Sequence, residues 1–426
     1  MTAQLLLLLA VFLGTMALRF PVILCITLST VAYALVYPVM PPVVVVQTLL
    51  MGLDRPVFAA IPYYFLLGAI MNAGGMSRRL LRLANALLGW CRGGLAHVNI
   101  GASMLFGGIS GSAVADASAI GSIMIPAMQK EGYPGAYAAA VTSCSACIGL
   151  LIPPSIPLVV FGLFNNVSVA DLFLAGVLPG LLMGVYLMLT SILIARRRGY
   201  AAHPWKGFAE VKAAIRGSAL ALLLPVLITF CMVKGVATVS EIGAIAVVYS
   251  IVVSLMVYRD VDLNTLGSTI VSSALDSAKV MSIIAVSGGT LWIIANMGLS
   301  ADIQSSLGAL RLPPYLLLGT MAIGLIVLGT VVSPTLQMIL VIPALTPVAI
   351  AQGIDVIQFG LVVVLASAIG LVTPPVGILL FLTSAQADTS VMSVVKESLP
   401  YLFALLLLLL CLILFPVLST GLLALL

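Results

Sequence analysis

Long runs of apolar residues follow one another along the chain, separated by short polar segments. The runs over residues 5–18 and 22–39 are almost continuously apolar, whereas a strand of a membrane barrel would alternate apolar and polar positions. Only helices and closed barrels can span a bilayer. Because one helical span needs about 20 residues, a chain of 426 residues has room for about ten spans. The pattern therefore predicts an all-α polytopic membrane protein.

The amino-acid composition of the chain excludes several classes of protein. Hydrophobic residues make up 62% of the chain and charged residues only 7%, against about 45–50% and 25% in soluble domains. These values exclude a soluble globular enzyme and a disordered chain. The net charge of +5 is too small and too scattered to indicate nucleic acid as a partner. The first twelve residues lack a basic region and a cleavage site, so we expect a retained first span.

Two pairs of matching phrases indicate an internal repeat. Ile-Pro-Ala occurs at 125–127 and again at 342–344. Further along, Ile-Gly-Leu, two residues and Pro-Pro occur at 148–154 and again at 369–375. Two matches in the same order predict a duplicated unit. Both halves therefore carry proline-interrupted helices in corresponding positions, which is typical of a secondary transporter with its binding site near the membrane midplane.

The positions of basic residues predict how the halves are oriented. Arginines cluster in 78–92 and basic residues again in 196–217, and both segments belong on the cytoplasmic side under the positive-inside rule. Counting spans puts 300–311, the counterpart of 78–92, on the opposite side, which predicts inverted repeats. The predicted first repeat is 1–195, with an arm helix at 78–92, a re-entrant hairpin at about 95–127 and a broken helix at 136–164. After a cytoplasmic linker at 196–217, the predicted second repeat is 218–418, with an arm at 300–311, a hairpin at about 313–350, a broken helix at 358–384 and a tail at 419–426.

The interruptions supply the candidate chemistry. Proline has no N–H group, so a break at Pro-Pro leaves helical carbonyls without partners, and carbonyl and hydroxyl oxygens are the ligands that hard cations prefer. We expect two sodium sites, each formed by a hairpin tip and the opposing break. The first would use Ser110, Gly111, Ser112, Ile152 and Pro153, and the second Ser333, Pro334, Thr335, Thr373 and Pro374. The alternative is that the hydroxyl groups only cap helices.

Three further residues are candidates for substrate binding or ion coupling. Asp116 is the one carboxylate in the first hairpin, and an ionisable residue inside the membrane indicates function, although it could simply stabilise a helix N-terminus. Ser155 follows the first Pro-Pro break. Arg55 could attract an anion or pair with Asp54. The Cys-x-x-Cys at 144–147 is interpreted as two small packing residues rather than a redox or metal motif.

Several segments resemble the large membrane subunit of tripartite ATP-independent periplasmic (TRAP) transporters. These are GGISGSAVADASAIGSIMIPAM, GLLIPPSIPLVVFG, DLFLAGVLPGLLMG and IGLVTPPVGILLF. The resemblance implies a sodium-coupled, elevator-type transporter of the bacterial inner membrane that takes up an organic acid such as a C4-dicarboxylate or sugar acid. It also implies a small four-span membrane subunit and a periplasmic substrate-binding protein as partners, beside membrane lipid. Ser333 stands where relatives often have Asp, and Ser367, a further substrate or coupling candidate, stands where they often have Asn.

Two other functions remain open at this point. One is a self-sufficient symporter of the divalent-anion type, which would need no partners. The other is an intramembrane enzyme, for which the sequence offers a serine-rich segment but no oriented base. A nucleotide-binding G-x-x-x-x-G-K motif is missing from the sequence. We therefore predict a transporter that is not an enzyme, with sodium as coupling ion and no other cofactor.

Overall fold

The computed structural model describes residues 2–37, 41, 43–44, 47–48, 56–202, 204–205, 207–298 and 312–425. These residues form helices and connecting turns, and no strand occurs among them. The predicted all-α polytopic architecture with hairpins and broken helices is confirmed. Arg55 and the predicted arm at 300–311 lie outside the described residues.

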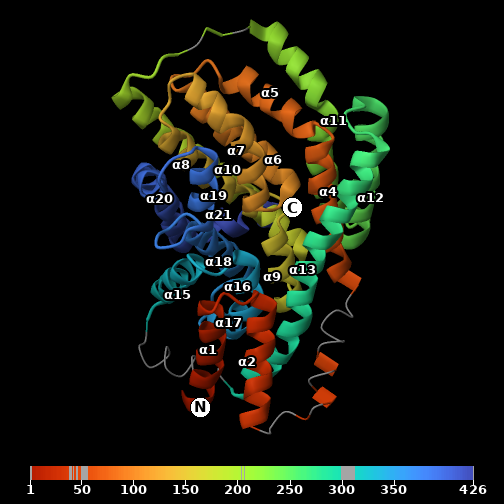
Figure 1. Ribbon diagram of the computed structural model, residues 1–426, viewed down its shortest axis with the longest axis vertical. Coiled ribbons are helices and arrows are strands. Elements are labelled where there is room, and N and C mark those ends of the chain that lie inside the picture. Colours follow the sequence, from red (N-terminus) through yellow and green to blue (C-terminus); the bar gives the residue numbers. More distant parts are fainter. Residues whose placement is uncertain are drawn as a thin grey trace.

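One group of helices, here called the frame, forms the right side and the lower centre of Figure 1. Its long helices pack around α4, which contacts both α12 and α13, while α2 contacts α13 as well. The frame consists of α1 (Thr2–Ala17), α2 (Val22–Val36), α4 (Ala60–Ala73), α5 (Met76–Leu88), α11 (Gly207–Val233), α12 (Val239–Val252) and α13 (Leu263–Asn296).

The remaining helices, here called the hairpin body, contain both Pro-Pro breaks. The first-repeat members are α6 (Gly94–Ser110), α7 (Ala113–Lys130), α8 (Gly135–Ala146), the short η2 (Cys147–Leu150), α9 (Ile156–Asn165) and α10 (Val169–Arg198). The second-repeat members are α15 (Pro314–Gly329), α16 (Pro334–Leu340), α17 (Ile342–Ala351), α18 (Val356–Gly370), α19 (Ile378–Gln386) and α20 (Val391–Leu414). In Figure 1 the hairpin of α6 and α7 lies in the upper half and that of α15 to α17 in the lower half.

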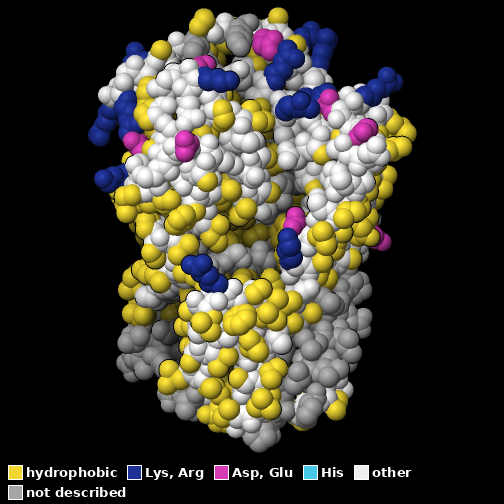
Figure 2. All heavy atoms as spheres, in the orientation of Figure 1, with side chains coloured by type: hydrophobic (Ala, Val, Ile, Leu, Met, Phe, Trp, Pro, Cys, Tyr) yellow, Lys and Arg dark blue, Asp and Glu magenta, His cyan; other side chains and the backbone are white. Residues whose placement is uncertain are grey.

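Length and composition allow the described helices to cross a membrane five times, or six times if the bent pair α16–α17, with its angle of 65°, counts as one span. Large apolar side chains are exposed on the outside of these helices, for example Val226 at 63% and Val248 at 60%. Lys and Arg side chains gather mainly at the upper end of the molecule, on both its left and its right side in Figure 2. The chain is a multi-pass membrane protein, and this basic end is the side that the positive-inside rule assigns to the cytoplasm.

Ion pairs join the amphipathic helix α5 to other parts of the frame. Arg82 Nε lies 3.0 Å from Glu210 Oε1 at the start of α11, and Arg79 pairs with Asp260 in the turn before α13. Its apolar side is buried, with Leu80 1% exposed. Because surface ion pairs contribute little stability by themselves, the buried face fixes the helix and the ion pairs orient it along the frame.

Within the hairpin body, hydrogen bonds join the two repeats at the basic end. The Tyr401 hydroxyl of α20 lies 2.8 Å from Ser191 Oγ of α10 and donates to Tyr137 Oη of α8 at 3.1 Å. Arg198 donates to Glu397 at 2.7 Å. Tyr401 is fully buried, so the two repeats are held as one unit through a polar contact that water does not reach.

Replacing Tyr401 by phenylalanine is expected to lower the thermal unfolding temperature of the purified protein. The change leaves the buried hydroxyls of Ser191 and Tyr137 with fewer partners, which destabilises by about 1–3 kcal/mol. Tyr315→Phe is the matched control, because Tyr315 is 50% exposed. Equal unfolding temperatures for both variants would show that the contact does not hold the repeats together.

Candidate functional site

The first hairpin turns at Gly111 and Ser112. Gly111 has φ +59°, a left-handed conformation that favours glycine. Ser112 caps α7 by accepting a hydrogen bond from the Ala115 N–H at 3.5 Å. The Ser110 hydroxyl is 3.4 Å from the Ser112 carbonyl oxygen. The tip is therefore compact and brings hydroxyl and carbonyl oxygens together at the end of α6.

The first break faces this tip directly. Helix α8 continues through η2 and stops before Pro153 and Pro154, and α9 begins at Ile156. The Ile156 N–H donates to the Gly111 carbonyl at 3.3 Å. A Cβ atom added at Gly111 would lie 2.6 Å from the Pro154 carbonyl oxygen, and one added at Gly108 would lie 3.3 Å from that of Pro153. The break thus directs carbonyl oxygens at the tip.

The residues of the first predicted sodium site come together in this arrangement. Ser110 and Pro153 are buried, and Ser112 and Ile152 are half-buried. The Ile152 side chain would contact a Cβ atom at Gly108 at 3.4 Å. Hydroxyl and carbonyl oxygens of this kind fit a sodium ion, because a hard cation prefers oxygen ligands.

The second hairpin and break repeat the pattern with different side chains. The Gly377 N–H, just before α19, donates to the Thr330 carbonyl of the tip at 3.2 Å. Its donor corresponds to Ile156, whereas its acceptor lies two residues before Val332, the counterpart of Gly111. Ser333 precedes α16 but forms no side-chain capping bond. The second tip and break are therefore also joined through the backbone.

The second predicted sodium site comes together only in part. Ser333, Pro334 and Thr335 line a common cavity with the first tip. Thr373 lies next to Gly377, since a Cβ atom at Gly377 would be 3.1 Å from its carbonyl oxygen, but its hydroxyl donates to Ile369 at 2.7 Å within α18. Pro374 is exposed.

A cavity of about 100 Å³ lies between the two tips. Helices α7, α9 and α19 all begin at its wall, and their N–H dipoles favour an anion there. Among the described residues, no charged side chain lines it. One frame residue, Phe65 of α4, reaches the cavity. The lining residues are Phe65, Gly111, Ser112, Ala113, Val114, Leu150, Ile156, Pro157, Ser333, Pro334, Thr335, Leu371 and Ile378.

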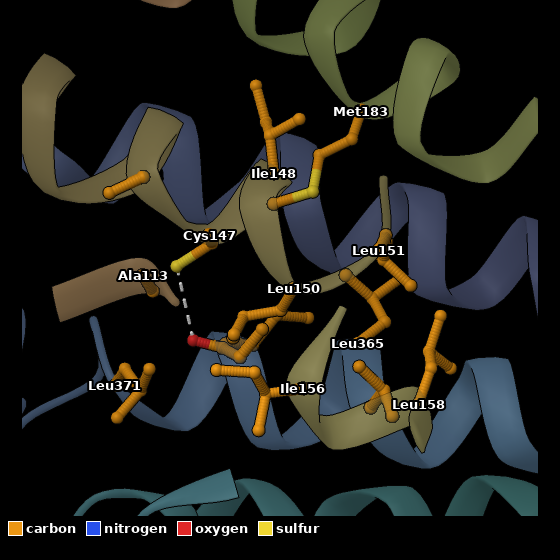
Figure 3. Close-up of a cluster of buried hydrophobic side chains, with 14 of the residues drawn as sticks. Ala113, Cys147, Ile148, Leu150, Leu151, Ile156, Leu158, Met183, Leu365 and Leu371 are labelled. Atoms are coloured by element: carbon orange, nitrogen blue, oxygen red, sulfur yellow. Dashed lines mark hydrogen bonds between the residues drawn. The ribbon is translucent and has the colours of Figure 1, made fainter. Parts of the chain in front are cut away.

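Behind the cavity, the two repeats pack directly against each other. Figure 3 shows Cys147 directed at α18, with its Sγ atom 3.4 Å from the Ala368 carbonyl oxygen. Ile156 and Leu371, which line the cavity, belong to the same buried cluster. Cys144 and Cys147 are both buried free thiols, which agrees with a packing role. Among the described residues, no group of acids, cysteines and histidines could hold a metal ion.

Three of the other candidate residues lie behind the cavity wall. Asp116, Ser155 and Ser367 are all fully buried and do not line it. Ser155 caps α9 and donates to the Leu150 carbonyl. Its hydroxyl is therefore engaged within the break.

Two residues at the site were not recognised from the sequence. Phe65 is one apolar residue among many in α4, and nothing in the pattern distinguishes it. Gln337 is fully buried beside the second tip. A glutamine within an apolar hairpin is a visible signal, and it could have been noticed.

Comparison with known proteins identifies the family. The family described as "Tripartite ATP-independent periplasmic transporter, DctM component" matches residues 9–418. The C4-dicarboxylate TRAP transporter large permease protein DctM of Pseudomonas aeruginosa is 38% identical over 363 residues, covering 85% of each chain. The sialic acid TRAP transporter large permease protein SiaM of Vibrio cholerae is 35% identical over 374 residues, covering 87% of each.

A solved structure matches the fold. The Alcanivorax borkumensis YdaH transporter superposes with a TM-score of 0.66 over 86% of each chain at 15% identity. The named relatives are permease proteins rather than enzymes, so the interpretation as a transporter is confirmed over that of an intramembrane enzyme. With the family match over nearly the whole length, the chain belongs to the DctM component family as the large permease subunit of a TRAP transporter.

Proposed function

We propose that the chain moves an organic acid anion into the cell across the bacterial inner membrane, driven by a sodium gradient. The observation that carries this proposal is the cavity between the two hairpin tips, where α7, α9 and α19 begin. Three helix N-termini favour a carboxylate in a place without charged side chains. Inner-membrane location follows from the family.

The relatives support an organic acid as substrate. Their names specify C4-dicarboxylates and sialic acid. Each of these molecules carries at least one carboxylate, which is the group that the helix N-termini would bind. The cavity wall between the tips is mostly apolar, so the carboxylate is the part of the substrate that this site recognises best.

Sodium coupling is supported by the first tip and break. The Ser110 hydroxyl lies 3.4 Å from the Ser112 carbonyl oxygen, and Cβ atoms added at Gly108 and Gly111 would lie 3.3 and 2.6 Å from the carbonyl oxygens of Pro153 and Pro154. Oxygen atoms of the tip and of the break therefore lie in the same small region. A cation bound there would add positive charge at the starts of α7 and α9 and so favour the anion in the neighbouring cavity. Sodium would then bind before or together with the substrate. The hairpin body would carry both past the frame in an elevator-type movement.

Two partners complete the proposed transporter. A small four-span membrane subunit would cover part of the apolar outer face of the frame, where Ile245 of α12 is 56% exposed. A periplasmic binding protein would deliver the substrate. Membrane lipid would contact the remaining apolar surface and the amphipathic helix α5. The alternative, a self-sufficient symporter of the divalent-anion type, needs neither partner protein.

Uptake into proteoliposomes tests the proposal. Vesicles containing this chain and its small subunit, with the binding protein outside, are expected to accumulate radiolabelled succinate or sialic acid, whichever the binding protein retains. Accumulation should require an inward sodium gradient and should not respond to ATP. Equal uptake with potassium in place of sodium would contradict sodium coupling. Full uptake by this chain alone would favour the self-sufficient symporter.

A further inference from the structure

Asp116 and Gln337 occupy corresponding places in the two repeats. Asp116 is the fourth residue after Ser112, which precedes α7, and Gln337 is the fourth after Ser333, which precedes α16. Both side chains are fully buried. Each repeat therefore places one polar side chain behind its own hairpin tip.

Both side chains also lie at the point where hairpin and broken helix cross. Gly107 meets Gly149 in the first repeat and Gly329 meets Gly370 in the second, so closely that an added Cβ atom would touch the opposing backbone. A Cβ atom at Gly149 would be 3.9 Å from Asp116 Oδ2, and one at Gly329 would be 3.1 Å from Gln337 Nε2.

The first crossing carries an uncompensated acid. Neither carboxylate oxygen of Asp116 has a hydrogen-bond partner among the described residues, and the Ser103 hydroxyl lies beside the group. A buried carboxylate without a partner is unfavourable unless it is protonated or a cation lies close to it. A sodium ion at the first tip would supply that charge.

At the second crossing, the buried polar side chain already has neutral hydrogen-bond partners. Gln337 Nε2 donates to the Val332 carbonyl of the tip at 3.1 Å, and the Ser367 hydroxyl lies 3.0 Å from Gln337 Oε1. The amide end must face Val332, because a carbonyl oxygen can only accept a hydrogen bond. One carbonyl that a cation at the second tip would use is thus bonded to the protein itself.

The second hairpin and its broken helix supply no charge of their own at the second crossing. Between 312 and 386 the sequence contains one acid, Asp355. Its carboxylate caps the start of α18, accepting from Ile357 and Gln358 at 2.9 and 3.0 Å. The crossing itself is at the opposite end of that helix, near Gly370.

We infer that the Gln337 amide takes the place of a second cation, so that this chain binds a single sodium ion, at the first tip and break. The inference rests on the proposed sodium coupling. It also assigns a role to Ser367, whose hydroxyl lies 3.0 Å from Gln337 Oε1 and shares its one proton between that oxygen and the Val363 carbonyl at 2.7 Å. In the second half of the transporter, the Gln337 amide then holds the tip carbonyl of Val332 within the hairpin, and Ser367 of α18 links that amide to the broken helix, without an ion between them.

Counting bound sodium tests the inference without knowledge of the substrate. Radiolabelled sodium is titrated onto the purified complex of this chain with its small subunit, with potassium chloride keeping the ionic strength constant. We expect about one sodium per chain in the wild type. Gln337→Glu should bind two, because a carboxylate would then face the Val332 carbonyl and a cation would be needed between the oxygens.

Gln352→Glu is the matched control, since it adds the same charge to the end of α17, at the other end of this hairpin, and should still bind one ion. Two ions in the wild type, or one in a folded Gln337→Glu protein, would overturn the inference. The wild-type count decides the question where Gln337→Glu does not yield monodisperse protein. No sodium binding to the wild type would instead overturn the sodium coupling on which the inference rests.

Discussion

Replacing Gly111 by valine is expected to raise the sodium concentration for half-maximal uptake by at least about tenfold, which corresponds to ~1.4 kcal/mol of lost binding energy. The cause is steric. A Cβ atom at this position would lie 2.6 Å from the Pro154 carbonyl oxygen and 3.2 Å from the Ile156 nitrogen. Both are backbone atoms of the break and cannot move aside without separating it from the tip. Sodium-dependent uptake into proteoliposomes measures the effect.

Gly132→Val is the matched control for this change. Gly132 also has a left-handed backbone, with φ +84°, but a Cβ atom there would have open space around it. Both variants therefore share the conformational penalty of about 1–2 kcal/mol, and only Gly111→Val pushes the tip away from the break. Similar sodium dependence in the two variants would show that the contact between tip and break does not hold the cation.

The sequence predicts most of the architecture because the bilayer restricts it. Continuously apolar spanning segments must be helices, and a Pro-Pro pair removes two successive N–H donors, so the motifs at 153–154 and 374–375 reveal both breaks. Single prolines such as Pro126 and Pro179 lie inside continuous helices. The repeated order of the phrases indicates that each break faces a hairpin tip. The hydrogen bonds from Ile156 to Gly111 and from Gly377 to Thr330 show how that pairing is made.

The details of the site could not be predicted for a different reason. Hydroxyl groups near a break can cap a helix, bond their own helix or face a ligand, and spacing does not distinguish these states. Thr373 was a candidate ligand, yet its hydroxyl bonds Ile369. Phe65 reaches the cavity only because α4 of the frame packs beside the hairpins. Such contacts depend on tertiary packing between segments far apart in the sequence.

The proposed difference between the repeats also rests on packing. At the sequence level, Asp116 stands out as an intramembrane acid, whereas Gln337 is an ordinary polar residue. Only the contacts of Gln337 with Val332 and Ser367 show that this side chain has hydrogen-bond partners at the second crossing. Ser333 is not an acid, which agrees with this arrangement. A tip whose carbonyl is bonded by an amide does not need a negative charge to hold a cation.

Replacing Gly370 by alanine is expected to lower the thermal unfolding temperature and to reduce uptake strongly. A Cβ atom here would lie 2.5 Å from the Gly329 Cα atom and 2.8 Å from the Ile326 carbonyl oxygen, both in the backbone of α15. Overpacking of this kind costs about 1–3 kcal/mol. The change also moves α15 away from α18, and with it the tip that Gln337 holds.

Gly324→Ala separates this effect from the general difference between glycine and alanine. Gly324 lies in α15, and a Cβ atom there meets no other atom within 4 Å. Alanine favours a helix over glycine by about 0.5–1 kcal/mol, so this control should be neutral or slightly stabilised. If Gly370→Ala matched the control in both unfolding temperature and uptake, the backbone crossing could not be what sets the distance between hairpin and break. If only uptake fell, the crossing would position the tip without contributing to stability.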